Sequence, residues 1–216
     1  DVITIPGKNK LAIMINDRLV QLSNEELINY LKTISSNDIK KIEVITTPPS
    51  KYDAEGNSGL INIVLKKITT DNWKATLRSS FGAATYTSYN NGVNFSFKKN
   101  KILLQSDINY NNGSWLKTKT NTYNYIDRKW IDNSETKENY NTISSRLNFE
   151  YNISKKITTG IQYFLNKSDL NVIDDNVSSI NYDNINNQNF NIITEGETKP
   201  KNISHSINLY SVYQID

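Results

Sequence analysis

Residues 52–67 read Tyr-Asp-Ala-Glu-Gly-Asn-Ser-Gly-Leu-Ile-Asn-Ile-Val-Leu-Lys-Lys, and this stretch divides the chain into two parts. A polar loop containing Gly56 and Gly59 leads into an apolar, β-branched segment that ends in a lysine pair. Such a segment is typical of a buried strand. The chain before it mixes helical and strand patterns, and the chain after it is rich in Asn and Tyr and alternates in polarity. We therefore predict an α+β unit over residues 1–67 and an all-β antiparallel region over residues 73–216.

The first part carries the signals of a small α+β unit. An apolar strand is predicted over residues 11–15, followed by a turn at residues 16–18. Ser23 and Glu26 form a capping-box pattern, which favours a helix over about residues 24–33. The helix has one apolar stripe, formed by Leu27, Ile28, Leu31 and Ile34. A second strand is predicted over residues 42–46, and Pro48 and Pro49 end it because proline cannot donate to a ladder.

The second part follows a period of two residues. Apolar and polar side chains alternate in six segments, which predicts six strands with one apolar face each. These segments are residues 73–81, 93–97, 104–110, 147–153, 157–165 and 203–209.

The connections between these strands alternate in length. Short connections are predicted at residues 98–101 and 154–156, and long ones at 83–90, 113–139 and 166–202. Because short and long connections alternate, all the long ones would lie at one end of the sheet. Outer-membrane barrels have this arrangement, with short periplasmic turns and long extracellular loops. Because six strands cannot close a barrel without exposed edges, we expect the chain to be part of a longer protein.

Composition narrows the function classes. Mean hydropathy is −0.59 and 37% of residues are hydrophobic, and no run approaches the roughly 20 apolar residues that a transmembrane helix needs. A transmembrane strand shows only every second residue to lipid, so this does not exclude a barrel. The net charge is +3, from 25 basic and 22 acidic residues without a dominant basic tract, which argues against nucleic-acid binding. The chain has one His and no Cys, which leaves little chemistry for an enzyme.

Residues 1–67 resemble a known family. The order of a strand with Asn16-Asp-Arg18, the helix Glu26-Leu-Ile-Asn-Tyr-Leu-Lys32, Ile42-Glu-Val-Ile-Thr-Thr-Pro48 and Lys51-Tyr-Asp-Ala-Glu-Gly-Asn-Ser-Gly-Leu-Ile-Asn-Ile63 is similar to the end of the plug in TonB-dependent outer-membrane receptors. The branch common in Bacteroidetes is the most similar. Residues 73–216 match only in pattern, as the first barrel strands of such a receptor would.

The resemblance implies import across the cell outer membrane. In this family a plug sits inside a lipid-embedded barrel, and a TonB-type partner contacts a segment before the plug to supply energy. The resemblance names no substrate for this chain and implies no cofactor, metal or catalytic residue. It implies that residues 1–67 are the C-terminal part of a plug and that residues 73–216 are the first six strands of an incomplete transmembrane β-barrel.

The resemblance also assigns roles to individual residues. Tyr52, Asp53, Glu55, Gly56 and Gly59 form the structural motif that leads from plug to barrel, where the two glycines permit a positive φ or a close backbone approach. Two tryptophans, Trp115 and Trp130, lie in a predicted extracellular loop. They either stack on the imported ligand or anchor at the membrane interface.

Other residues are predicted to have structural roles. Arg18 and Glu43 are candidates to bridge the plug to the barrel wall. His205 is predicted to pack on the apolar face of the last strand. The loop carboxylates are expected to be solvated, with cation binding as the alternative; they are Asp174, Asp175, Glu195 and Glu197.

A second function class stays open. A soluble all-β binding or adhesion module, with a small α+β cap, could use long Asn-rich loops to hold a glycan or a protein. Detergent dependence distinguishes the two classes.

Overall fold

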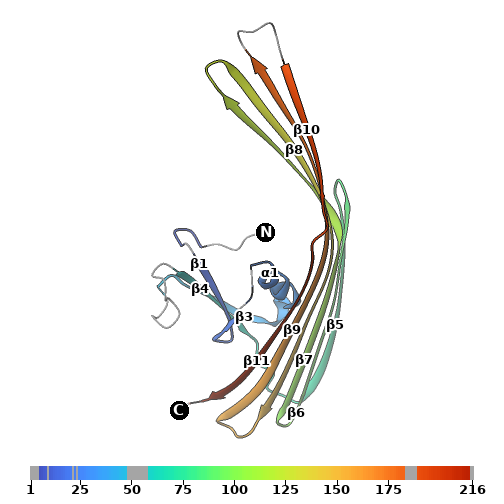
Figure 1. The fold of residues 1–216 in the computed structure, drawn as a ribbon. Coiled ribbons are helices and arrows are strands. Elements are labelled where there is room, and N and C mark those ends of the chain that lie inside the picture. The colour runs from blue at the N-terminus through green and yellow to red at the C-terminus, as the bar shows by residue number, and fades with distance from the viewer. Residues whose placement is uncertain are drawn as a thin grey trace.

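The computed structural model describes residues 5–8, 10–20, 22, 24–47, 58–182 and 189–214. The chain is mostly antiparallel β-sheet with one short α-helix. It contains a four-stranded sheet near the N-terminus and a larger seven-stranded sheet. We call the described residues up to Lys67 the N-terminal unit and strands β5 to β11 the large sheet (Figure 1).

The N-terminal unit is built from four strands and a helix. Its elements are β1 (Lys10–Ile15), β2 (Arg18–Val20), α1 (Asn24–Thr33), a 3₁₀ turn (Ser36–Asp38), β3 (Ile39–Ile45) and β4 (Ser58–Leu65). The strand order is β2-β1-β4-β3, with β4 parallel to β1 and antiparallel to β3. The helix and both predicted strands are confirmed, and β3 begins three residues earlier than expected. Among the described residues, no helix is long and apolar enough to cross a membrane.

The core of the N-terminal unit lies between α1 and its sheet. Ile13, Ile15 and Ile63 from the strands meet Leu27 and Tyr30 from the helix. The apolar run of β1 and the apolar stripe of α1 both supply side chains to this core, which explains why the sequence pattern located the two elements. One residue of the large sheet, Phe164, also belongs to this cluster.

Two residues with positive φ turn β1 into β2. Asn16 and Asp17 have φ of 50° and 64°, and Ile15 pairs directly with Arg18. This is a two-residue hairpin with both central residues in the left-handed region, which Asn and Asp tolerate better than most residues. Asn62 of β4 holds the turn, because its amide donates to the Asp17 carboxylate at 2.7 Å and its oxygen accepts the Asp17 N–H at 3.1 Å.

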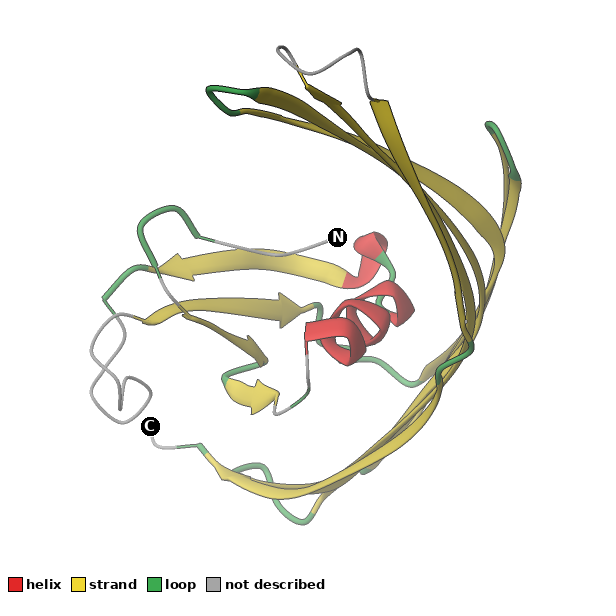
Figure 2. Cartoon of the chain, turned by 45° about the horizontal axis from the view of Figure 1, so that its top comes forward, coloured by secondary structure: helices red, strands yellow, loops and turns green. Residues whose placement is uncertain are grey.

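The large sheet is antiparallel throughout. Its strands are β5 (Asn72–Ala83), β6 (Thr87–Lys99), β7 (Ile102–Asn124), β8 (Arg128–Asn152), β9 (Ile157–Tyr182), β10 (Asn189–Thr198) and β11 (Lys201–Tyr213). Strands β5 to β9 pair in sequence order, and β10 and β11 both pair with β9, one beyond the other along its length. The sheet is strongly curved, and the N-terminal unit lies on its concave side (Figure 2).

The predicted long loops are wrong. Residues 113–124 continue β7, residues 128–139 begin β8, and most of 166–202 belongs to β9 and β10. The connection predicted at 83–90 shrinks to residues 84–86. The paired strands β7 to β10 extend far beyond the end of β5 (Figure 1). We call residues 112–140, 170–182 and 189–198 the blade.

Candidate functional site

The two faces of the large sheet differ in polarity. One cross-strand row on the convex face runs across six strands and is apolar throughout: Trp73, Phe97, Leu104, Phe149, Ile161 and Leu209. Convex apolar side chains are exposed along β8 from Ile143 to Tyr151. That span is about 27 Å of strand, comparable with the apolar band of about 25 Å on outer-membrane strands.

The concave face is polar. The row next to the middle of the sheet consists of Thr76, Asn94, Asp107, Arg146, Phe164 and Ser206. A neighbouring row contains Arg78, Asn109, Asn166 and Ser204, each with a buried polar side-chain atom that lacks a hydrogen-bond partner among the described residues. Buried amides and guanidinium groups need polar partners, so this face is suited to an aqueous space and unsuited to a dry core.

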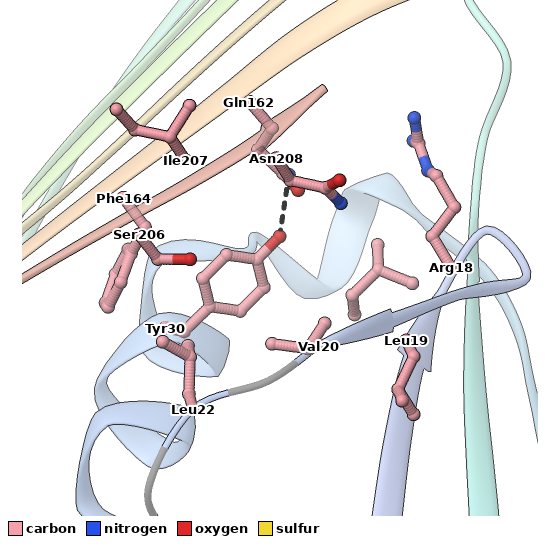
Figure 3. A pocket seen from close by; sticks show the side chains of 11 residues that line it. Arg18, Leu19, Val20, Leu22, Tyr30, Gln162, Phe164, Ser206, Ile207 and Asn208 are labelled. Carbon is pink, nitrogen blue, oxygen red and sulfur yellow. Dashed lines mark hydrogen bonds between the residues drawn. The ribbon is translucent and has the colours of Figure 1, made fainter. Parts of the chain in front are cut away.

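Helix α1 docks on the concave face mainly through polar contacts. The Asn94 amide donates to the carbonyl of Thr33 at 3.0 Å. The Gln162 amide donates to the hydroxyl of Tyr30 at 2.8 Å, and the Tyr30 ring packs edge-on against Phe164 at 5.1 Å (Figure 3). The contacts of Tyr30 with Gln162 and Phe164 border a cavity of about 230 Å³ between the N-terminal unit and strands β9 and β11. The tyrosine therefore links the helix to the sheet through both its ring and its hydroxyl.

A buried ion pair lies beneath the helix. The Nε of Arg146 on β8 donates to the Asp107 carboxylate on β7 at 2.9 Å, and both residues are about 5% exposed. Asn94 donates to the other carboxylate oxygen. The Arg146 guanidinium carbon also lies 5.8 Å from the centroid of the Tyr30 ring. The pair is thus shared by three strands and the docked helix.

Arg18 bridges the N-terminal unit to the large sheet, as the sequence predicted. Its guanidinium carbon lies 3.8 Å from the centroid of the Tyr210 ring, and its Nη2 lies 3.9 Å from Oε1 of Glu150. The Tyr210 hydroxyl donates to the same Glu150 oxygen at 2.7 Å. The β1–β2 turn, which Asn62 holds in place, therefore presents Arg18 to the large sheet.

The prediction for Glu43 as a second bridge is wrong. Its carboxylate pairs with Lys41 at 2.5 Å and accepts the Asn62 amide at 2.8 Å, both within the four-stranded sheet. The hydrogen bond from Lys41, and then that from Asn62, hold the pKa of Glu43 below its usual value. The same Glu43 hydrogen bond raises the pKa of Lys41. Sequence alone could not show which of the two sheets this side chain faces.

The two tryptophans lie on the blade but are not brought together. Trp115 pairs with Glu138 on β8, eight residues from Trp130, so the two rows are about 27 Å apart. Register places both on the face that continues the concave side. Trp130 lies in a cross-strand row with Tyr123, Ile180 and Phe190, and the Tyr123 and Trp130 rings are 5.7 Å apart. The partner strand of Tyr123 lies within residues 113–139, where the sequence predicts a loop.

Most of the predicted plug-to-barrel motif lies outside the described residues, namely Tyr52, Asp53, Glu55 and Gly56. Gly59 is described, lies in β4 opposite Leu11, and does not have a positive φ. A Cβ at Gly59 would lie 2.6 Å from Cδ1 of Ile5 and 3.3 Å from Cγ of Lys8, so the side chains of two residues approach this glycine closely.

The described residues assemble no cluster of metal ligands. Among them there is no group of three or more His, Cys, Asp or Glu side chains that could hold an ion. His205 lies in the convex row of Leu165, as predicted, and its Nδ1 is 2.7 Å from the Tyr163 hydroxyl. Asp174 accepts a hydrogen bond from Thr136, and Glu197 pairs with Lys199.

Comparison with known proteins identifies no family for this chain. The chain matches no protein-family model and no curated protein sequence.

Proposed function

We propose that this chain forms part of a TonB-dependent receptor of a bacterial outer membrane, which imports a substrate. In this proposal the large sheet is part of the wall of a transmembrane β-barrel and the N-terminal unit is the end of its plug. A TonB-type partner would supply the energy for import. The support for this partner is the resemblance of residues 1–67.

One observation carries the proposal. The layer that packs on the large sheet lies against its polar face, while the apolar face is uncovered within the described structure. A soluble sandwich or adhesion module does the reverse, because apolar burial against a second layer stabilises it. Lipid is the environment that makes an uncovered apolar face favourable.

The edges of the large sheet agree with this proposal. Among the described residues, β5 pairs only with β6, and β10 and β11 pair only with β9. Unpaired edges are unfavourable in a bilayer, so a wall of this kind requires further strands on both sides.

The blade would then project beyond the membrane on the outer side. Its strands carry polar side chains on both faces, and they bend toward the side occupied by the N-terminal unit (Figure 1). Register places the aromatic row of Tyr123, Trp130 and Phe190 on the face of the blade that continues the concave side. This placement favours a ligand-contacting role for the tryptophans over anchoring at the interface.

Fluorescence quenching by lipid tests the proposal. The full-length protein is placed in vesicles of brominated phosphatidylcholine, whose bromine atoms quench tryptophans that touch acyl chains. Trp73 is convex and 70% exposed, so Trp73→Phe should remove quenchable emission. Trp115→Phe and Trp130→Phe are matched controls and should leave it unchanged. Equal quenching of all three, or a protein that stays in the aqueous fraction, would overturn the proposal.

A further inference from the structure

The two short turns of the large sheet carry four exposed lysines. Lys99 and Lys101 flank the β6–β7 turn, and Lys155 and Lys156 form the β8–β9 turn. Both turns lie at the end of the sheet opposite the blade (Figure 1). We call these four lysines the basic rim.

The two turns are neighbours in space. The N–H of Asn152 donates to the carbonyl of Lys101 at 2.8 Å, and Nζ of Lys101 donates to the carbonyl of Ile153 at 3.1 Å. Asn100, at the tip of the first turn, has φ of 51° and donates its N–H to Asp71 at 2.8 Å. The rim is therefore a hydrogen-bonded edge of the sheet, with Asp71 as a nearby acidic side chain.

Charge at this end has one dominant sign. Residues 98–102 and 151–157 contain five lysines and no acidic residue. The described part of the blade, at the other end, has five basic and eight acidic residues. The rim thus offers a positive surface, whereas the blade mixes both signs.

The rim borders the apolar convex face directly. Exposed Ile102 follows Lys101 by one residue, and exposed Ile153 precedes Lys155 by two. Long lysine side chains place their stems on apolar surface and their ammonium groups in the polar layer beyond it. An ammonium beside a lipid-facing band lies at the depth of the headgroups.

We propose that the basic rim binds the phosphates of anionic glycerophospholipids in the leaflet at the short-turn end. This rests on the proposed function, because it requires the convex face to lie in a bilayer. Lysines near an anionic bilayer surface are attracted to it. The exposed apolar residues Ile102 and Ile153 beside these lysines favour a lipid headgroup over an acidic protein as the partner.

The test compares the full-length protein in two kinds of vesicle, phosphatidylcholine alone and phosphatidylcholine mixed with phosphatidylglycerol. The rim variant changes Lys99, Lys101, Lys155 and Lys156 to Gln. The control variant removes the same charge from the blade, by changing Lys117, Lys119, Lys129 and Lys137 to Gln. The measurement is the unfolding rate in each vesicle, followed by loss of β-sheet circular dichroism.

Wild type and the blade control should unfold more slowly in the anionic vesicles. For the rim variant, the ratio of the unfolding rate in neutral vesicles to that in anionic vesicles should fall about tenfold or more. The reason is that each lysine near an anionic surface adds to the attraction between the protein and that surface. A variant with the same four lysines changed to Arg should keep the ratio and shows that the turns tolerate substitution. Added salt should reduce the ratio for wild type.

Two results would overturn the inference while leaving the proposed function intact. The rim variant could keep the full ratio, which would leave an acidic protein as the partner of the rim. The blade control could lose as much as the rim variant, which would show a non-specific effect of net charge. Failure of every variant to enter either vesicle would instead contradict the proposed function.

Discussion

Arg18 stacks on the ring of Tyr210, with its guanidinium carbon 3.8 Å from the ring centroid. The two residues come from opposite ends of the chain, one from the β1–β2 hairpin and one from β11. Glu150 completes the contact from β8. This trio joins the N-terminal unit to the large sheet at a place distinct from helix α1.

Replacing Arg18 or Tyr210 should weaken the contact between the N-terminal unit and the large sheet. In a double-mutant cycle of Arg18→Ala and Tyr210→Leu, we expect a coupling of about 0.5–2 kcal/mol in the free energy of unfolding. Denaturant unfolding of the full-length protein in detergent micelles measures it. Arg18→Lys should recover only part of the coupling, because an ammonium lacks the planar group that stacks on the ring. Strictly additive single mutants would contradict the proposed contact energy.

Gly160→Ala should displace Tyr210. A Cβ at Gly160 would lie 2.5 Å from Cζ of Tyr210 and 2.8 Å from the carbonyl oxygen of Phe149, and the backbone atom cannot easily yield. We expect a loss of about 1–3 kcal/mol in unfolding free energy from overpacking. The matched control is Gly196→Ala, where the nearest atom would be 3.9 Å away and the change should be within about 0.5 kcal/mol. An equal effect at both glycines would refute the steric explanation.

Asp107→Asn should be strongly destabilising. It would leave the Arg146 guanidinium buried without its counter-ion, which costs about 3–5 kcal/mol. Adding Arg146→Met should restore part of the loss, since the unpaired charge is then removed. Asp175→Asn, at an exposed site on the blade, is the control and should change stability by less than about 0.5 kcal/mol. Thermal or denaturant unfolding of the four proteins measures these differences.

The Lys41–Glu43 pair should make stability depend on pH in acid. The pKa of Glu43 is lowered in the folded chain by its hydrogen bonds to Lys41 and Asn62. The stabilisation is therefore fully present above the ordinary glutamate pKa of about 4.3, and it is lost as pH falls through the lowered value. Glu43→Gln should flatten the acid side of the stability profile.

The charge-matched control for that profile is Glu195→Gln on the blade, which should keep the acid dependence of wild type. Hydrogen exchange of the β3 and β4 amides, followed from neutral pH down to about pH 3, reports the effect locally. An unchanged profile in Glu43→Gln would mean that the pair contributes nothing to folding.

The hydrophobic pattern located the elements that bury one face. Helix α1, strand β1, most of β5, parts of β6 to β9 and much of β11 are predicted, because each has an apolar stripe, an apolar run or an apolar alternate row. The strands of the blade are not predicted by the sequence, because they lack such a stripe or row. Its strands carry Asn, Thr, Ser and charged residues on both faces, so alternation gives no signal, and pairing with neighbouring strands is what orders them.

The sequence by itself determined the elements that have an apolar stripe or an apolar face, the polarity of the two faces and the lysine-bearing turns, because periodicity and turn chemistry act over a few residues. Residues 58–67 of the opening stretch form β4 and the start of the passage to the large sheet. Only the tertiary structure decided that Asn62 holds the hairpin turn, that Arg18 reaches Tyr210, and that Glu43 pairs within its own sheet. These contacts join residues far apart in the chain, and their geometry depends on strand register and sheet curvature, which no short-range pattern encodes.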